Sequence, residues 1–258
     1  MTPPAVCLTI AGIDSSGGAG VLMDVAMIRL SGSHPAAVIS ATTAQNSTGV
    51  HDVHLIPPRH LKAQLDAVFS DMDVRAVKTG MLADSSTISV VAEALSGATI
   101  PVVVDPVMVA TSGSALTVDD TIAALQERLI PCATLLTPNI PEAERLLHAP
   151  IRSFASPEEM ALVLAERTRT AVLLKGGHGE GETILDVLAT PETVTTLKMQ
   201  RRKGTYHGTG CALSAAIASL LGQGVELLPA VKAARTLLVN AIDGAFRPGH
   251  SEMLYLKV

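Results

Sequence analysis

The feature that most constrains the fold of this chain is the alternation of short apolar runs with longer segments of helical periodicity. Apolar runs typical of buried strands cover residues 5–11, 36–44, 50–56, 74–79, 100–104, 133–136 and 171–174, with a hairpin-like pair at 183–189 and 193–198. Helical segments cover residues 21–30, 58–72, 85–95, 117–129, 141–147, 157–167, a stretch after 208, and 228–245. This alternation predicts a mostly parallel sheet with helices on both faces. We therefore predict an α/β fold with one domain spanning residues 1–258.

Composition narrows the range of partners and compartments. Charged residues are only 17% of the chain, the formal net charge is −5 and aromatic residues are 2%, so the basic groove and stacking platforms of a nucleic-acid binder are not evident. No apolar stretch approaches the roughly 20 residues of a membrane span. The first residues lack the basic region of a secretory signal. Three cysteines without CxxC spacing fit a reducing compartment, so we expect a cytoplasmic protein that binds neither nucleic acid nor membrane.

Glycine-rich or polar segments follow most of the predicted strands. They are GIDSSGGAG (residues 12–20), Gln45-Asn46, Gly80-Met81, Asp105-Pro106, Thr137-Pro138-Asn139 and Lys175-Gly176-Gly177-His178. In an open parallel sheet, ligands bind beyond the carboxyl ends of the strands, so we expect the functional site there. The first loop matches neither GxGxxG nor GxxxxGK[ST], so neither a Rossmann dinucleotide site nor a P-loop is predicted.

Residues 207–218, HGTGCALSAAIA, read as a tight glycine turn that leads directly into a buried helix. The first amides of a helix lack internal partners and carry the positive end of its dipole, so Gly208, Thr209, Gly210 and Cys211 form a candidate anion site. The same field predicts a lowered pKa for the Cys211 thiol, which could then take a proton. An inert, buried cysteine at the start of a small-residue helix is an equally open interpretation.

Four polar residues at strand ends have both a structural and a functional interpretation. Asp105 caps a turn or helps to bind a ligand. Asn139 and Glu142 form a capping box, or they orient water on Mg²⁺, which prefers oxygen ligands and retains water. Lys175, between an apolar strand and two glycines, is placed to bind phosphate, although it could be a solvated surface lysine.

Together these segments contain the components that phosphoryl transfer requires. They are two glycine loops, an anion-binding helix start, a cation, an Asn/carboxylate pair and a candidate base, which position and neutralise phosphates and accept a hydroxyl proton. The histidines at 34, 51, 54 and 60 have no metal-ligand spacing and are predicted to lie on the surface.

Seven motifs occur in the order found in a known family. They are TIAGIDSSGGAG (9–20), AQN (44–46), KTGML (78–82), VVVDPVMVATSG (102–113), TPNIPEAERLL (137–147), LLKGGH (173–178) and HGTGCALSAAIA (207–218). Over about residues 5–245 the chain resembles the hydroxymethylpyrimidine/phosphomethylpyrimidine kinases of thiamin biosynthesis, in the ribokinase superfamily. The resemblance implies a ribokinase-like sheet of about eight strands, usually in a homodimer. It also implies two ATP- and magnesium-dependent phosphorylations, of the hydroxymethyl group and then of the monophosphate.

The resemblance also implies roles for individual residues. Cys211 would be the base, and the amides of residues 208–211 would form the anion hole. Magnesium and phosphate would be organised by Asp105, Asn139 and Glu142, with Asp105 and Glu142 acting mostly through water. The residues near the ATP phosphates would be Lys175, Gly177 and Thr209, and the pyrimidine pocket would be formed by Gly12, Asp24, Gln45, Met81 and Val107. The chemistry of the pocket fits, because the Gln45 amide complements an aminopyrimidine edge. Met81 and Val107 can sandwich a flat ring.

The chain departs from the family at several positions. Thr111 replaces a lysine usual near the phosphates, Leu22 replaces a polar residue, and Tyr206 and Thr205 stand where Thr and Asn are usual. Losing a cation near phosphates makes the second phosphorylation the less secure of the two.

Two alternatives therefore stay open. One is a pyridoxal-type vitamin kinase of the same superfamily, from which Gln45 is the distinguishing residue. The other is a catalytically impaired protein that binds a pyrimidine, against which the presence of Cys211, Lys175, Asn139 and Glu142 argues.

Overall fold

The computed structural model describes residues 3–108, 119–177 and 181–258. In this part of the chain nine strands form one sheet in the order β3-β2-β1-β4-β5-β6-β7-β8-β9. The strands β2, β1, β4, β5, β6 and β7 are mutually parallel. Of the other three, β3 runs antiparallel to β2, β8 to β7, and β9 to β8. The bounds are β1 Val6–Asp14, β2 His34–Asn46, β3 Gly49–Leu55, β4 Val74–Thr79, β5 Val102–Val104, β6 Leu135–Leu136, β7 Ala171–Leu174, β8 Thr183–Ala189 and β9 Val194–Gln200.

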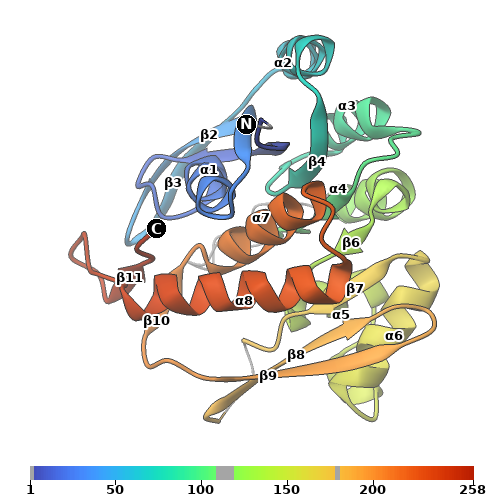
Figure 1. Cartoon of the computed structure of the whole chain (residues 1–258), viewed down its shortest axis with the longest axis vertical. Helices are drawn as coiled ribbons and strands as arrows, with labels where there is room; N and C mark the ends of the chain where they lie inside the picture. Colours follow the sequence, from blue (N-terminus) through green and yellow to red (C-terminus); the bar gives the residue numbers. More distant parts are fainter. Residues whose placement is uncertain (1–2, 109–118, 178–180) are drawn as a thin grey trace.

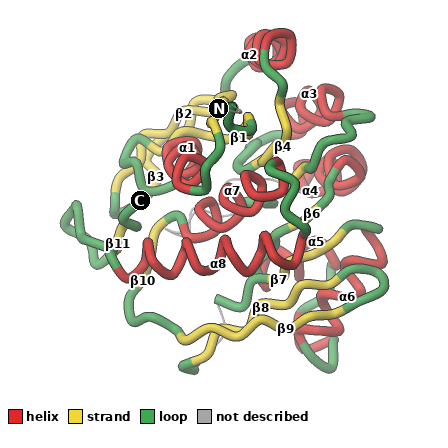
Figure 2. Tube along the Cα trace, viewed as in Figure 1, coloured by secondary structure: helices red, strands yellow, loops and turns green. Residues whose placement is uncertain are grey.

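Helices cover both faces of the sheet (Figure 1; Figure 2). One layer holds α1 (Gly20–Leu30), α7 (Thr209–Gly222) and α8 (Leu227–Asp243), which pack against one another. The other layer holds α2 (Pro58–Asp71), α3 (Ser85–Leu95), α4 (Asp119–Ala124), α5 (Ile140–Leu147) and α6 (Pro157–Thr168), with a π-helical turn η1 (Leu125–Leu129) and 3₁₀ turns η2 (Ile130–Cys132) and η3 (Ile151–Ser153). A separate two-stranded parallel sheet joins β10 (Thr205–His207) to β11 (Met253–Tyr255).

The central strands are apolar at successive positions because each of their two faces packs in a different hydrophobic core. In β5, Val102 and Val104 pack with the layer that contains α2 to α6, while Val103 packs with α1, α7 and α8. Successive side chains of a strand point to opposite faces, so a strand covered on both sides needs apolar residues throughout. This is the physical basis of the predicted α/β class, which the structure confirms.

The predicted elements are present, with differences at their ends. The sheet has nine strands where the resemblance implied about eight. The strands β1 and β2 extend through Asp14 and Asn46, so Gln45 lies on a strand and not in the predicted loop, because the paired strand β3 continues the ladder that far. The strands β10 and β11 were not predicted, since three residues are too few to show periodicity. Thr117, the predicted first residue of α4, lies outside the described residues.

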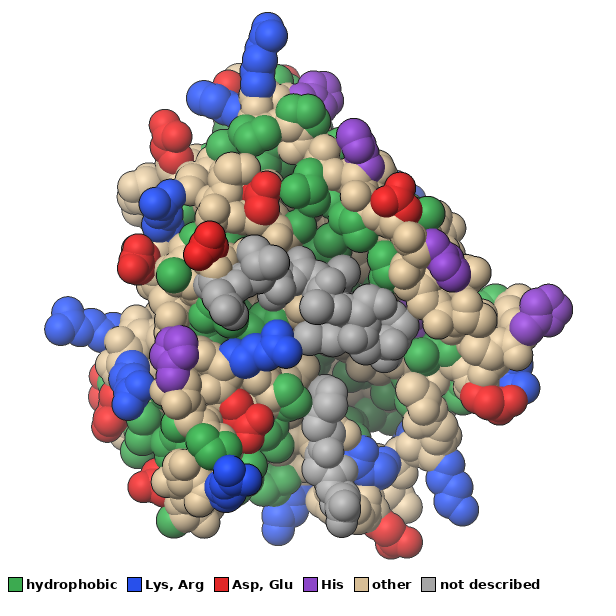
Figure 3. All heavy atoms as spheres, turned by 180° about the vertical axis from the view of Figure 1, so that it is seen from behind, with side chains coloured by type: hydrophobic (Ala, Val, Ile, Leu, Met, Phe, Trp, Pro, Cys, Tyr) green, Lys and Arg blue, Asp and Glu red, His purple; other side chains and the backbone are tan. Residues whose placement is uncertain are grey.

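The described surface carries mixed charge. On the face shown in Figure 3, acidic and basic side chains are interspersed among apolar ones. The histidines at 34, 51, 54 and 60 are exposed, as predicted. Among the described residues, no helix combines the length and apolar character needed to cross a membrane.

A buried ion pair joins α8 to the strand that supports the loop after β7. The Arg235 guanidinium donates from Nε to Asp186 Oδ2 at 2.9 Å and from Nη2 to the Leu197 carbonyl at 2.9 Å. The other oxygen of Asp186 accepts from the Gly176 N–H at 2.9 Å. The pair therefore fixes the backbone next to Lys175.

Arg235→Ala should destabilise the fold strongly, because it leaves the Asp186 carboxylate buried without its counter-ion. Breaking a buried pair costs about 3–5 kcal/mol, measurable as a loss in the free energy of unfolding by urea denaturation. The matched control is Arg202→Ala, which removes a partly exposed pair with Asp243 and should change stability little. Equal losses in the two variants would contradict this role of Asp186 and Arg235.

Candidate active site

The carboxyl ends of the parallel strands open into a cavity of about 710 Å³. Predicted site residues from seven separate segments line it together: Gly12, Gln45, Met81, Asp105, Val107, Asn139, Glu142, Lys175, Gly177, Gly208, Thr209, Gly210 and Cys211. The topology explains this meeting, because parallel strands end at the same edge of the sheet. These residues therefore meet at the predicted edge of the sheet; that this cavity is the functional site, and the roles of these residues, stay predictions.

The start of α7 forms one wall of the cavity. Gly208, the N-cap residue, has φ 76°, and a Cβ there would lie 2.0 Å from the Gly18 carbonyl oxygen. The two glycine-rich loops therefore meet backbone to backbone, which only glycine permits. A Cβ on Gly210 would lie 3.2 Å from Lys175 Nζ, so the first turn of α7 lies close to that ammonium group. This wall combines the two elements of an anion site, helix amides and a cation.

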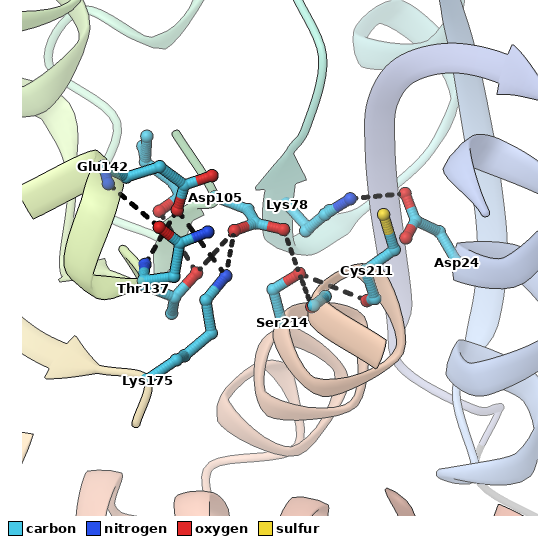
Figure 4. Close-up of polar contacts among 11 residues, drawn as sticks. Asp24, Lys78, Asp105, Thr137, Glu142, Lys175, Cys211 and Ser214 are labelled. Atoms are coloured by element: carbon cyan, nitrogen blue, oxygen red, sulfur yellow. Dashed lines mark hydrogen bonds and ion pairs between the residues drawn. The ribbon is translucent and has the colours of Figure 1, made fainter. Parts of the chain in front are cut away.

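Lys175 and Asp105 form a charge pair at this wall. Lys175 Nζ lies 2.8 Å from Asp105 Oδ1, which also accepts a hydrogen bond from Thr137 Oγ1 at 3.2 Å. Figure 4 shows Asp105 between Lys175 on one side and Lys78 on the other. Although burial opposes ionisation, these two ammonium groups hold the pKa of Asp105 below its usual value. Asp105 is thus an anchored carboxylate and not merely a turn cap.

Asn139 and Glu142 form the predicted capping box at the start of α5. Asn139 Oδ1 accepts from the Glu142 N–H at 2.9 Å, and Glu142 Oε2 accepts from the Asn139 N–H at 2.8 Å. Burial, together with the negative charge of Asp105 and against the attraction of Lys175, raises the pKa of Glu142 to about 7. One ammonium group serves two carboxylates here, since Lys175 Nζ lies 3.9 Å from Glu142 Oε2.

This donor set fits Mg²⁺ only with help from other oxygens. Among the described residues no cluster of three or more His, Cys, Asp or Glu side chains could hold a metal by itself. Asp105 and Glu142 offer two carboxylates with a deficit of positive charge beside them. Mg²⁺ keeps several waters and is bound by one or two carboxylates plus substrate phosphates, so the set suits a magnesium–nucleotide complex.

Asp24 does not line the cavity, contrary to the predicted pyrimidine pocket. Its side chain is fully buried on α1, where Oδ2 accepts from Lys78 Nζ at 2.7 Å and from Thr9 Oγ1 at 2.6 Å. Lys78, on β4, is also fully buried and lies between Asp24 and the cavity, which it lines. A charge buried this deeply persists only when it is paired. Asp24 therefore lies behind the cavity wall, as the counter-ion of Lys78.

The predicted lowering of the Cys211 pKa is wrong. Burial raises the pKa of the thiol to about 11, and the carboxylates of Asp24 and Asp105 add to this, against the opposing effects of Lys78 and the Gly20 N–H. Figure 4 shows the sulfur directed toward the pair of Lys78 and Asp24. The helix start is present as predicted, but loss of water around the sulfur outweighs its field.

Gly12, Gln45 and Met81 line the part of the cavity, here called the ring end, that is predicted to hold a flat ring. A Cβ on Gly12 would lie 3.2 Å from Met81 Sδ, so a side chain there would press on Met81. Ser15 holds the Gln45 backbone at both ends, since Ser15 Oγ donates to the carbonyl at 2.8 Å and accepts from the N–H at 2.9 Å. The Gln45 side chain can therefore present its amide to a ligand from a fixed backbone.

Lys78, Asp14 and His207 are among the residues of the cavity that sequence reasoning missed. A lysine within the apolar run of β4 was the available signal for the first, because a buried charge requires a partner. Of the departures from the family, Tyr206 lines the cavity, Leu22 is 43% exposed and does not line it, and Thr111 lies outside the described residues.

A doubly covered parallel sheet with a helix start and a lysine facing one cavity defines a kinase-like α/β protein. Comparison with known proteins identifies which one. A model of the family described as phosphomethylpyrimidine kinase matches residues 14–255. The chain therefore belongs to the phosphomethylpyrimidine kinase family, whose members are phosphotransferases.

Individual relatives agree with the family assignment. The hydroxymethylpyrimidine/phosphomethylpyrimidine kinase of Rhizobium meliloti (strain 1021) is 46% identical over 94% of this chain and 92% of its own. The structure of phosphomethylpyrimidine kinase from Clostridium difficile 630 is 36% identical with a TM-score of 0.79, covering 92% of this chain and 99% of that one. An ADP complex of Bacillus subtilis pyridoxal kinase is 29% identical with a TM-score of 0.88, covering 98% and 97%.

Alkylation of Cys211 by iodoacetamide should be slow at neutral pH and should accelerate tenfold per pH unit up to about pH 11. Only the thiolate reacts, and a pKa near 11 in place of 9.0 leaves about a hundredfold less of it at pH 8. Peptide mass spectrometry of the unliganded protein measures this site apart from Cys7 and Cys132. A rate that levels off near pH 7 would show instead that the dipole at the start of α7 lowers the pKa of Cys211 more than burial raises it.

Proposed function

We propose that this chain transfers the γ-phosphoryl group of ATP to the hydroxymethyl group of 4-amino-5-hydroxymethyl-2-methylpyrimidine, and then a second one to the resulting monophosphate, in thiamin biosynthesis. The observation that carries the proposal is the meeting in one cavity of the α7 start and Lys175 at one end and Gln45 at the other. Charged groups that can bind a phosphate and an amide that can bind a ring lie in different parts of this cavity, which suits a small aromatic alcohol. The names of the relatives support the same substrate.

At the phosphate end, the amides of Gly208, Thr209 and Gly210 and the Lys175 ammonium group neutralise the transferred group. Asn139 and Gly177 lie beside the nucleotide phosphates. Asp105 and Glu142 would hold Mg²⁺, mostly through water, and the metal would supply charge neutralisation on the phosphates. The residues of the chain position the phosphates and the hydroxyl, which is most of the catalysis in phosphoryl transfer.

At the ring end, the Gln45 amide pairs with the aminopyrimidine edge, and Met81 and Val107 lie against the faces of the ring, with Gly12 leaving room beside them. This places the hydroxymethyl group toward Cys211. Cys211 accepts the hydroxyl proton as a thiolate. Because its thiol is protonated at neutral pH, the thiol first releases its proton to solvent water, and the Lys78 ammonium group stabilises the thiolate that forms.

We further propose a cytoplasmic homodimer. The three cysteines, all free, fit a reducing compartment. Analytical ultracentrifugation at micromolar concentration tests the dimer.

The purified chain with Mg-ATP should release ADP with the pyrimidine alcohol at a kcat/KM at least about tenfold above that with pyridoxal. Gln45→Ala should lower the value for the pyrimidine by about 10- to 100-fold, because it leaves ring donors and acceptors unpaired, and should change the value for pyridoxal little. A coupled ADP assay with both alcohols measures this. Preference for pyridoxal would establish the pyridoxal-kinase alternative, which the Bacillus subtilis likeness keeps open. Pyrimidine binding without ADP release would establish the impaired binding protein.

Cys211→Ala should lower kcat by about 100- to 10,000-fold if the sulfur accepts the proton, and leave KM for the pyrimidine unchanged. Cys132→Ala is the matched control, since Cys132 lies away from the cavity and should keep full activity. A Cys211→Ala rate within about threefold of the parent would assign catalysis to positioning and the anion site alone.

A further inference from the structure

His207 lies at the end of β10, directly before the glycine turn, and touches the ring end of the cavity. Its side chain is 6% exposed. Its Nε2 lies 2.8 Å from Asp14 Oδ2 and 3.2 Å from Gln45 Nε2.

The surroundings of His207 determine which ring nitrogen carries the proton. Nδ1 is buried and has no hydrogen-bond partner, so a proton there would be an unsatisfied donor. Nε2 faces a carboxylate oxygen, which accepts only. The neutral ring with its proton on Nε2 is therefore the state that satisfies Asp14 and leaves no buried donor unpaired.

A chain of donors keeps Asp14 in its acceptor role. Tyr255 Oη donates to Ser16 Oγ at 2.7 Å, and Ser16 Oγ and Ser16 N donate to Asp14 Oδ1 at 2.7 and 2.8 Å. The rings of Tyr255 and His207 pack with centroids 5.2 Å apart. A Cβ on Gly18 would lie 2.2 Å from the His207 ring and 2.6 Å from that of Tyr255, so the histidine has no room to turn.

The other neighbour of the Gln45 amide is Thr43, which also has its proton committed. Thr43 Oγ1 has one proton and two acceptors within reach, the Ile13 carbonyl at 3.1 Å and Gln45 Oε1 at 3.4 Å, and the nearer Ile13 carbonyl takes it. With Gln45 Nε2 toward His207, the N–H groups of both side chains meet, and Gln45 Oε1 receives at best a share of the Thr43 proton. A half-turn of the amide exchanges Oε1 and Nε2 with no other movement: Oε1 then shares the Nε2 proton that His207 donates to Asp14, and Gln45 Nε2 donates to Thr43 Oγ1.

We propose that His207 is a positioning residue that holds the Gln45 amide with its oxygen toward His207 and its nitrogen toward Thr43, and thereby fixes which way round the substrate ring binds. An aminopyrimidine edge presents a donor beside an acceptor, and it pairs with this amide in one orientation only. Turning the amide over turns the ring over and moves the hydroxymethyl group away from the α7 start. The inference rests on the proposed pyrimidine substrate.

The test is a double-mutant cycle on KM for the pyrimidine alcohol. His207→Phe keeps a ring against Tyr255 and removes the donor, and it should raise KM by about 10- to 100-fold with KM for ATP unchanged. His207→Gln places an amide N–H near Nε2 and should stay within about threefold of the parent. In a Gln45→Ala background, His207→Phe should raise KM by less than about twofold, because His207 acts through that amide.

Two results would overturn the role of His207: full additivity in the cycle, or equal effects of Phe and Gln. Thermal midpoints of all variants are measured alongside, because a merely structural role lowers both the midpoint and KM for ATP. If the parent does not phosphorylate the pyrimidine, the proposed function fails by itself.

A second measurement needs no activity. Nuclear magnetic resonance of the unliganded protein should show the neutral His207 ring protonated on Nε2. The Gln45 amide protons should show contacts to the Thr43 methyl group and none to the His207 ring. A proton on Nδ1, or amide contacts to His207, would refute the proposed orientation whatever the substrate.

Discussion

The arrangement of the active site depends on the buried ion pair between Lys78 and Asp24. It joins β4 to α1 behind the cavity wall, and Thr9 donates to the same carboxylate oxygen as Lys78. A charge pair removed from water is costly to form and more costly to break, so it fixes the relative position of the two elements. The Lys78 ammonium group also lowers the pKa of Asp105 and opposes the rise in the pKa of Cys211, so this ion pair affects the charge of two residues that line the cavity.

The sequence was informative where a property is local. The apolar runs and the spacing of Asn139 and Glu142 predicted strands and a capping box that the structure contains. The burial of Asp24 and the raised pKa of Cys211 could not be predicted in this way, because desolvation depends on what packs around a group from distant segments. The short strand that carries His207 was missed because three residues are too few to show periodicity and because the strand that pairs with it follows 48 residues later.

The two ends of the cavity differ in their electrostatic balance. At the phosphate end, Asp105 and Glu142 share one ammonium group, and burial raises the pKa of Glu142 to about 7. The proposed magnesium–nucleotide complex would relieve this repulsion. At the other part of the cavity, Asp14 has contacts with His207 and Ser16, so the residues beside Gln45 are held in place.

The contacts that complete the ring end link very distant parts of the chain. Asp14 and His207 are 193 positions apart, and Ser16 and Tyr255 are 239 apart. A ribosome adding about 5–20 residues per second needs roughly 10–50 s to span such a separation. The first glycine loop therefore emerges long before its partners exist, while the neighbouring strands β1, β2 and β4 can already pair. During synthesis the contacts of Asp14 and Ser16 therefore form late, together with the core that α7 and α8 complete.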